Sequence, residues 1–203
     1  MRLRCSCGHN HSALSLRGKP LNPLILLKKY FAGNEKGFDM VYEHSRLVAS
    51  KALTIALSWG FDGASLKFIE EAALLHDIGV VGTSSPRLGC RGTAPYICHG
   101  ILGREILERE GYQEHALVCE RHIGVGLTTE DIIRQGLALP HREMTPVTLA
   151  ERIICFADLF YTKKLDRLDR ELTIVEVRQG LSRFGEEKVR VFESWLNEFH
   201  PEP

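Results

Sequence analysis

The sequence predicts an all-α protein. Apolar residues recur at intervals of three and four along most of the 203-residue chain, which is the period of an amphipathic helix. Capping residues and terminating glycines bracket these stretches, while no segment has a convincing strand pattern, an internal repeat or a linker rich in Pro or Ser. A hydrophobic share of 44% at this length is enough to build a sizeable core.

Two helices are predicted near the amino terminus. Asn22 and Pro23 supply the cap and first turn of a short helix that ends near Phe31. Asp39 is placed to cap a second helix reaching about Trp59, where a glycine follows as a stop signal.

A third helix is predicted from Ser65 to Asp77, and it is followed by a loop over 80–96 that is rich in Gly and Pro. Such a long loop is typically functional or mobile. Four later helices are expected over these ranges: His99 to before Gly111, Gln113 to His122, Thr129 to before Gly136, and Pro146 to Lys164. Two more are expected on either side of Gly185. A Thr173–Glu176 capping box starts the first of them, and an apolar stripe ending at Phe199 marks the second.

Charge and cysteine usage exclude several classes of protein. Lys plus Arg equals Asp plus Glu at 26 each, so no net field favours nucleic acid or anionic lipid, and we expect no specific nucleic-acid partner. The apolar runs are too short to span a membrane, and the first residues lack the apolar centre of a secretory signal. Six scattered cysteines are typical of reduced thiols, and we therefore expect a cytoplasmic protein.

Several imidazoles and carboxylates fall on inward-facing positions of different predicted helices. One such histidine is usually an ordinary core residue, but burying this many ionisable groups without a shared partner costs several kcal/mol for each. A divalent cation binds neutral imidazole nitrogens and carboxylate oxygens directly, and helix bundles often hold metals between facing helices. The residues in question are His44, His76, Asp77, His99, His122 and Asp158.

The run His76-Asp77-Ile78-Gly79, with His44 upstream and Asp158 downstream, resembles the HD-domain superfamily of metal-dependent phosphohydrolases. His99 and His122 resemble the two extra histidines of its bimetal branch. The resemblance covers about 24–164 and implies an HD-domain helical bundle with extra C-terminal helices. We accordingly expect a segment over 1–20, the metal-binding domain over 21–170, and helices over 171–203 that pack on the same domain.

Carried over to this sequence, the family pattern implies one metal held by His44, His76, Asp77 and Asp158. Asp77 would bridge to a second metal held by His99 and His122. Two divalent transition-metal ions of iron, manganese or zinc would then activate a water for attack on a phosphate ester. The implied substrate is a nucleotide or another small phosphorylated metabolite.

The motif lacks one residue for binding the substrate phosphate, because Val80 stands where phosphodiesterase members often have a lysine. The basic candidates are Arg91, Arg104, Arg121 and Lys163. Arg121 is favoured because it neighbours His122, so Asp77 and Arg121 are the expected catalytic residues.

Other possibilities stay open. His115 competes with His122 on helical spacing, His141 is either a pocket or a surface residue, and the run Cys5, Cys7, His9 and His11 is either a zinc ligand set or a flexible terminus. Some members of the superfamily are diiron oxygenases, and a non-catalytic ligand-binding module is a third reading. A homodimer is a further possibility.

Overall fold

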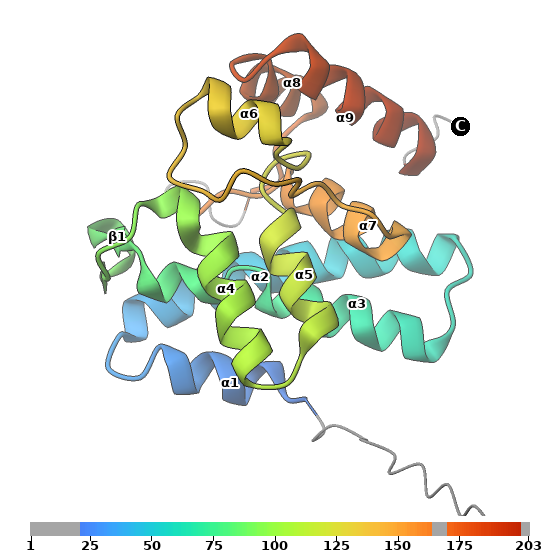
Figure 1. Ribbon diagram of the computed structural model, residues 1–203. Helices are drawn as coiled ribbons and strands as arrows, with labels where there is room; N and C mark the ends of the chain where they lie inside the picture. Colours follow the sequence, from blue (N-terminus) through green and yellow to red (C-terminus); the bar gives the residue numbers. More distant parts are fainter. Residues whose placement is uncertain (1–20, 164–169, 200–203) are drawn as a thin grey trace, which may run out of the picture.

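The computed structural model describes residues 21–163 and 170–199, and in this part of the chain it confirms the predicted all-α class. The N-terminal Cys/His run lies outside the described residues. Figure 1 shows the helices stacked from α1 at one end to α8 and α9 at the other. The helices are α1 Pro23–Tyr30, α2 Glu35–Ser58, α3 Gly63–Leu75, α4 His99–Arg109, α5 Gln113–Arg121, α6 Thr129–Arg134, α7 Leu149–Asp158, α8 Ile174–Ser182 and α9 Glu186–Phe199.

Three predicted helix boundaries are wrong: the start of α2 and both ends of α7. The side chain of Asn34 accepts a hydrogen bond from the Gly37 backbone, so α2 begins at Glu35, and Asp39 lies inside the helix. In the same way the side chain of Thr148 caps α7, so this helix begins at Leu149 and Pro146 lies before it rather than in its first turn. Helix α7 also ends at Asp158 rather than continuing to Lys164. Its carboxyl end therefore leaves Asp158 at a helix terminus, beside the irregular segment that follows.

The segment between α3 and α4 is ordered rather than a plain loop. It contains three 3₁₀ turns, η1 Ile78–Gly82, η2 Pro86–Leu88 and η3 Tyr96–Cys98, and two short strands, β1 Ser84–Ser85 and β2 Cys90–Arg91. The strands pair antiparallel, with Ser84 opposite Arg91, which the sequence pattern did not indicate because each strand has only two residues. Gly89 makes the turn between them in the left-handed region, at a φ of 68°.

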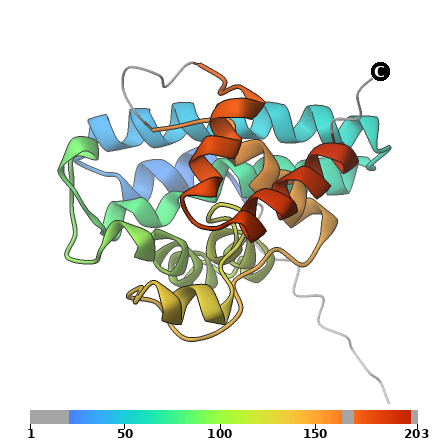
Figure 2. The same cartoon turned by 90° about the horizontal axis from the view of Figure 1, so that it is seen from above.

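The C-terminal helices share the main hydrophobic core with the helices before them. Val177 of α8 and Phe192 of α9 belong to the same buried cluster as Val48 of α2 and Phe156 of α7. Figure 2 shows α9 lying across α7, with α2 on the far side. The rings of Phe156 and Phe192 stack with centroids 5.8 Å apart, so α9 is joined to α7 by direct aromatic packing.

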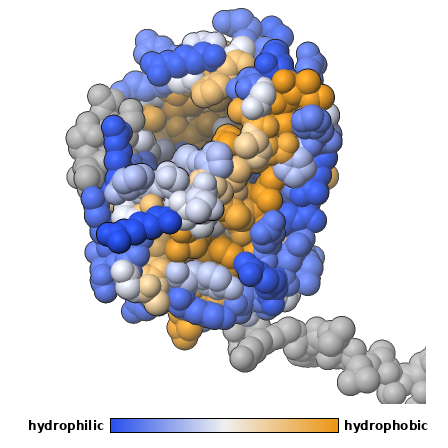
Figure 3. All heavy atoms as spheres, turned by 60° about the vertical axis from the view of Figure 1, so that its left-hand side comes forward, coloured by the Kyte–Doolittle hydropathy of each residue, from blue (hydrophilic) through white to orange (hydrophobic). Residues whose placement is uncertain are grey.

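Apolar side chains also reach one outer face. Figure 3 shows a hollow lined with hydrophobic residues in the upper part of that face. A cavity of about 240 Å³ between the segment after α5 and the end of α8 has this character, and Ile97, Ile123 and Leu181 are among its lining residues. Within the described residues, no helix combines the length and the apolar content needed to cross a bilayer.

Backbone packing at two glycines sets the distance between η1 and α4. A Cβ atom on Gly79 would lie 2.0 Å from the His99 carbonyl oxygen and 2.2 Å from the Gly103 nitrogen. Only a glycine fits this position, because no side chain can share that space with backbone atoms. The close approach brings the start of α4, where His99 lies, against the residues that follow α3.

Candidate metal centre

Six titratable side chains from five helices meet at one buried point. His44 comes from the middle of α2, whereas the others lie at helix termini, where a side chain can turn inward without breaking the helix. His44, His76 and Asp77 have no exposed surface, and His99 and His122 are 5% and 1% exposed. Besides His44, the cluster consists of five residues near helix ends: His76 and Asp77 after α3, His99 at the start of α4, His122 after α5 and Asp158 at the end of α7.

Three of the four imidazoles are held by the same local contact. In each, Nδ1 donates to the backbone carbonyl three residues earlier, and since a carbonyl only accepts, the proton must lie on Nδ1. Each Nε2 then faces the centre of the cluster. The acceptors are Ala73 for His76 at 2.6 Å, Tyr96 for His99 at 2.7 Å, and Cys119 for His122 at 2.7 Å.

The Nε2 atoms face one another in two pairs. His44 Nε2 lies 3.3 Å from His76 Nε2, and His99 Nε2 lies 3.1 Å from His122 Nε2. Because His99 and His122 have already placed their Nδ1 protons on carbonyls, two neutral rings would present lone pair to lone pair. A shared cation removes this repulsion.

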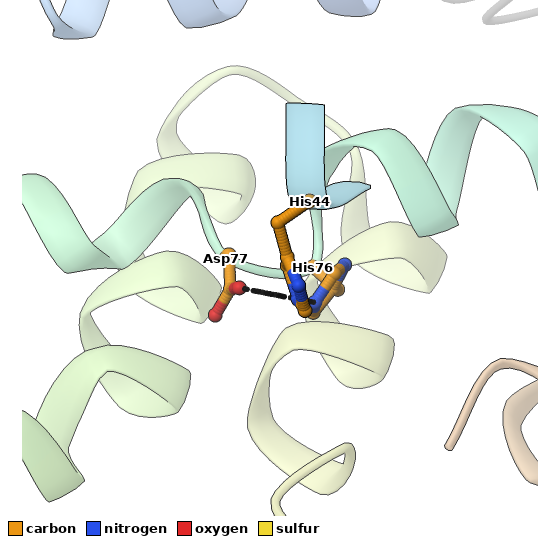
Figure 4. A group of neighbouring side chains, drawn as sticks. All are labelled: His44, His76 and Asp77. Carbon is orange, nitrogen blue, oxygen red and sulfur yellow. Dashed lines mark hydrogen bonds and ion pairs between the residues drawn. The ribbon is translucent and has the colours of Figure 1, made fainter. Parts of the chain in front are cut away.

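Asp77 lies between the two pairs of histidines. Its Oδ2 is 3.1 Å from His76 Nε2 and 3.3 Å from His44 Nε2, while its Oδ1 is 3.4 Å from His99 Nε2 and 3.6 Å from His122 Nε2. Figure 4 shows the rings of His44 and His76 directed at this carboxylate. Both oxygens of Asp77 are buried, and the titratable groups that face them are these four imidazoles and the ammonium group of Lys163. Such an arrangement suits a bridging ligand.

Asp158 completes the group on the side of α7. Its Oδ1 lies 2.9 Å from His44 Nε2 and 3.5 Å from His76 Nε2. Ligand atoms from His44, His76 and Asp77 lie within 4.8 Å of one another, as do those from Asp77, His99 and His122, and those from His76, His122 and Asp158. Imidazole nitrogens and carboxylate oxygens are the donors that divalent first-row metals accept, so the residues fit such ions.

Burial and neighbouring charges set strongly divergent proton affinities in this cluster. Burial opposes the charged form of His76, but the Asp77 and Asp158 carboxylates outweigh it and raise the pKa to about 10. Burial dominates for His99 and lowers its pKa to about 3. Although burial acts in the opposite direction, the surrounding cations and donors hold the pKa values of Asp77 and Asp158 well below the usual carboxylate range.

Among the residues that the structure describes, Lys163 is the lysine or arginine that reaches the cluster. Its Nζ lies 2.6 Å from Asp77 Oδ2, and its side chain is 16% exposed. Arg121 does not take that position. It is the last residue of α5, immediately before His122. Since adjacent helical residues point about 100° apart, its Nη1 instead lies 3.0 Å from the buried carboxylate of Glu151.

The remaining basic and histidine candidates lie elsewhere. Arg104 binds Glu108 and Glu120, and His141 is exposed. His115 is turned toward α3, where its Nε2 lies 3.5 Å from Glu71. On spacing alone His115 and His122 were equivalent, and the structure brings only His122 to the cluster.

A cleft of about 560 Å³ opens beside Asp158 and Lys163. Tyr96 is a lining residue that sequence reasoning missed: its carbonyl holds His99, and its ring lies against the His99 ring with centroids 4.7 Å apart. The available signal was its position three residues before a ligand candidate, the same offset that Ala73 and Cys119 occupy. The other walls come from the hairpin segment 84–88 and from Tyr161 and Thr162.

Comparison with known proteins agrees with this geometry. Residues 41–163, which contain all six clustered residues, match the HD domain family. An uncharacterized protein of Methanocaldococcus jannaschii is 35% identical over 147 residues, which cover 70% of this chain and 79% of that protein.

Two further relatives carry the name tRNA (cytidine(56)-2′-O)-methyltransferase. The protein of Thermoplasma volcanium is 30% identical over 80% of this chain, and that of Picrophilus torridus is 27% identical over 88%. The chain spans only 40% and 44% of their lengths, less than half of each. On the family match and the clustered His and Asp residues together, the chain belongs to the HD domain family.

Proposed function

We propose that this protein is a metal-dependent phosphohydrolase acting on a small phosphate ester, such as a nucleotide or another phosphorylated metabolite. The observation that carries the proposal is the buried pairing of imidazole Nε2 atoms on either side of the Asp77 carboxylate. Without a metal ion, the lone pairs of His99 and His122 face each other beside two desolvated carboxylates.

In this proposal one divalent ion is held by His44, His76, Asp77 and Asp158, and a second by Asp77, His99 and His122. When bound, such ions supply a Lewis acid for phosphoryl oxygens and lower the pKa of a bound water. The backbone carbonyls behind His76, His99 and His122 keep their Nε2 lone pairs aimed at the ions. Ligand orientation therefore does not depend on the substrate.

The cleft supports a small phosphorylated substrate. Its volume of about 560 Å³ is within the usual range for small-molecule sites. Lys163 lines it with Asp158, so a cationic side chain stands where phosphate oxygens would approach the cluster. The hydroxyl groups of Ser84 and Ser85 add donors on the hairpin side.

The names of two relatives refer to methyl transfer to tRNA, but we do not extend that activity to this chain. Its family match is to the HD domain, and it corresponds to less than half of each methyltransferase.

The first test is metal content, measured on tag-free protein purified without chelator under reducing, low-oxygen conditions. We expect two equivalents of a first-row metal, none in the Asp77→Asn variant, and metal-dependent release of phosphate from at least one ester in a panel of nucleotides and sugar phosphates. Oxygen consumption by the iron form without phosphate release would support a diiron oxygenase instead. Failure to bind metal after reconstitution would overturn the proposal and favour a ligand-binding module.

A further inference from the structure

Two basic side chains from separate parts of the chain line the same cleft. Lys163 follows α7, and Arg87 lies in η2 within the hairpin between η1 and α4. The charge of Lys163 lies at the end of the cleft beside the His/Asp cluster, where it pairs with Asp77. Arg87 has no such contact with the cluster and lines the hairpin wall of the cleft.

Arg87 is exposed, and in residues 21–163 and 170–199 it has no hydrogen-bond or ion-pair partner. The two arginines considered above as phosphate-binding candidates on α4 and α5 differ, since Arg104 pairs with Glu120 and Arg121 pairs with Glu151. Within the described part of the chain, the guanidinium of Arg87 thus has unpaired donors on the wall of the cleft, and its planar shape matches the oxygens of a phosphate or a carboxylate.

The backbone that carries Arg87 is anchored. Leu88, its neighbour, is 5% exposed, and the Leu88 carbonyl accepts a hydrogen bond of 3.2 Å from the Asn34 side chain at the start of α2. Pro86 fixes the other side of the turn. Arg87 is consequently presented to the cleft from a fixed position, which reduces the ordering cost of binding an anion there.

We infer that the substrate carries a second anionic group, a phosphate or a carboxylate, which Arg87 binds apart from the phosphoryl group that reacts at the His/Asp cluster. Ser84 and Ser85 line the same wall and supply further donors to that group. Tyr96 and Tyr161 line the cleft as well and provide aromatic surface for the body of the substrate. This inference rests on the proposed phosphohydrolase function and makes Arg87 a specificity-determining residue.

The test compares phosphate esters that differ in one anionic group. The pairs are adenosine 5′-monophosphate with adenosine 3′,5′-bisphosphate, and glycerol phosphate with 3-phosphoglycerate, so that the second group is a phosphate in one pair and a carboxylate in the other. For Arg87→Ala we expect the KM of the two-anion ester to rise about tenfold, the usual scale for losing a charge-assisted contact. The kcat and the KM of the one-anion ester should be unchanged. Arg87→Lys should recover part of the loss, and Arg190→Ala, an exposed arginine of α9 outside the cleft, should change nothing.

Binding to chelator-treated protein separates this inference from the proposed function. If no ester is hydrolysed, the phosphohydrolase proposal fails, and titration calorimetry of the same four esters still decides the role of Arg87. Weaker binding of a two-anion ester to Arg87→Ala than to wild type supports the second anion site, and the pair affected identifies a phosphate or a carboxylate. The second anion site would be overturned if Arg87→Ala lost the same affinity for both members of a pair, or lost affinity for neither. It would also be overturned if wild type bound no two-anion ester.

Discussion

Lys163 Nζ lies 2.6 Å from Oδ2 of Asp77, the carboxylate on which the four histidines converge. Burial disfavours the ammonium ion, but Asp77 and the other anionic neighbours outweigh burial and raise the pKa of Lys163 above its ordinary value. The proposed metals would share Oδ2 with this ammonium group. Lys163 is therefore expected to balance the charge of Asp77 most strongly when no metal is bound.

This relationship predicts a metal-dependent stability effect for Lys163→Met. In chelator-treated protein the variant leaves Asp77 buried without its ammonium partner, and it should lose on the order of 3 kcal/mol of unfolding free energy. With Mn²⁺ present the loss should be clearly smaller. Urea denaturation followed by circular dichroism measures both. Lys51, which is similarly buried but pairs with the exposed Glu171, is the matched control, and Lys51→Met should cost the same with and without metal.

Metal stoichiometry should separate the two halves of the cluster. His99→Ala or His122→Ala should retain about one of two metal equivalents, because Asp77 and the His44 side remain, whereas Asp77→Ala should lose both. Elemental analysis measures the metals, and circular dichroism checks that the helices remain. His115→Ala removes a half-buried histidine of α5 outside the cluster and should keep full metal content. Equal loss of both metals in His99→Ala would show that the two sites are inseparable.

Metal binding should release protons in a defined direction. The pKa of His76 is raised to about 10 without metal, so at neutral pH this imidazole is protonated and an incoming ion must displace that proton. Apparent affinity should then fall about tenfold for each pH unit of acidification, and this dependence should vanish above about pH 10. Calorimetric titration with Zn²⁺ in buffers of different ionisation enthalpy reports the proton count. An apparent enthalpy independent of the buffer would contradict the prediction.

Gly79 should tolerate no side chain. In Gly79→Ala the new methyl group would meet the backbone of His99 and Gly103, so η1 and α4 must separate. We expect a loss of roughly 3 kcal/mol or more in stability together with weaker metal binding, because His99 moves away from Asp77. Gly63→Ala, at the start of α3, meets no atom within 4 Å and should leave stability and metal content intact. Thermal unfolding and elemental analysis of the two variants test the difference.

Local signals in the sequence were sufficient for most helices and for the set of clustered residues. Asn22 with Pro23 and the Thr173–Glu176 capping box lie where the structure places helix starts, because a cap is satisfied by atoms within one turn. The predicted start at Asp39 was wrong because Asn34 is also a good capping residue and lies five residues earlier. Its side chain accepts a hydrogen bond from the Gly37 backbone, and the residue types alone did not distinguish the two candidate caps.

The position of the basic side chains relative to the cluster could not be predicted from neighbouring residues in the sequence. Proximity in sequence to His122 favoured Arg121, but neighbouring helical residues diverge, and Glu151 from α7 pairs with that arginine. Lys163 reaches Asp77 only because α7 ends at Asp158 and the chain turns there. Arg87 lay in a segment read as a plain loop, since strands of two residues leave no periodic pattern.

The sequence by itself determined the all-α class, the family and the identity of the six clustered residues, because helical period, caps and the His-Asp-Ile-Gly motif are properties of short stretches of chain. Only the tertiary structure shows which cation meets Asp77, that Arg121 turns to Glu151, and which side chains line the cleft. Those outcomes depend on the packing of segments distant in sequence, above all the backbone contact at Gly79, and no local pattern encodes such a contact.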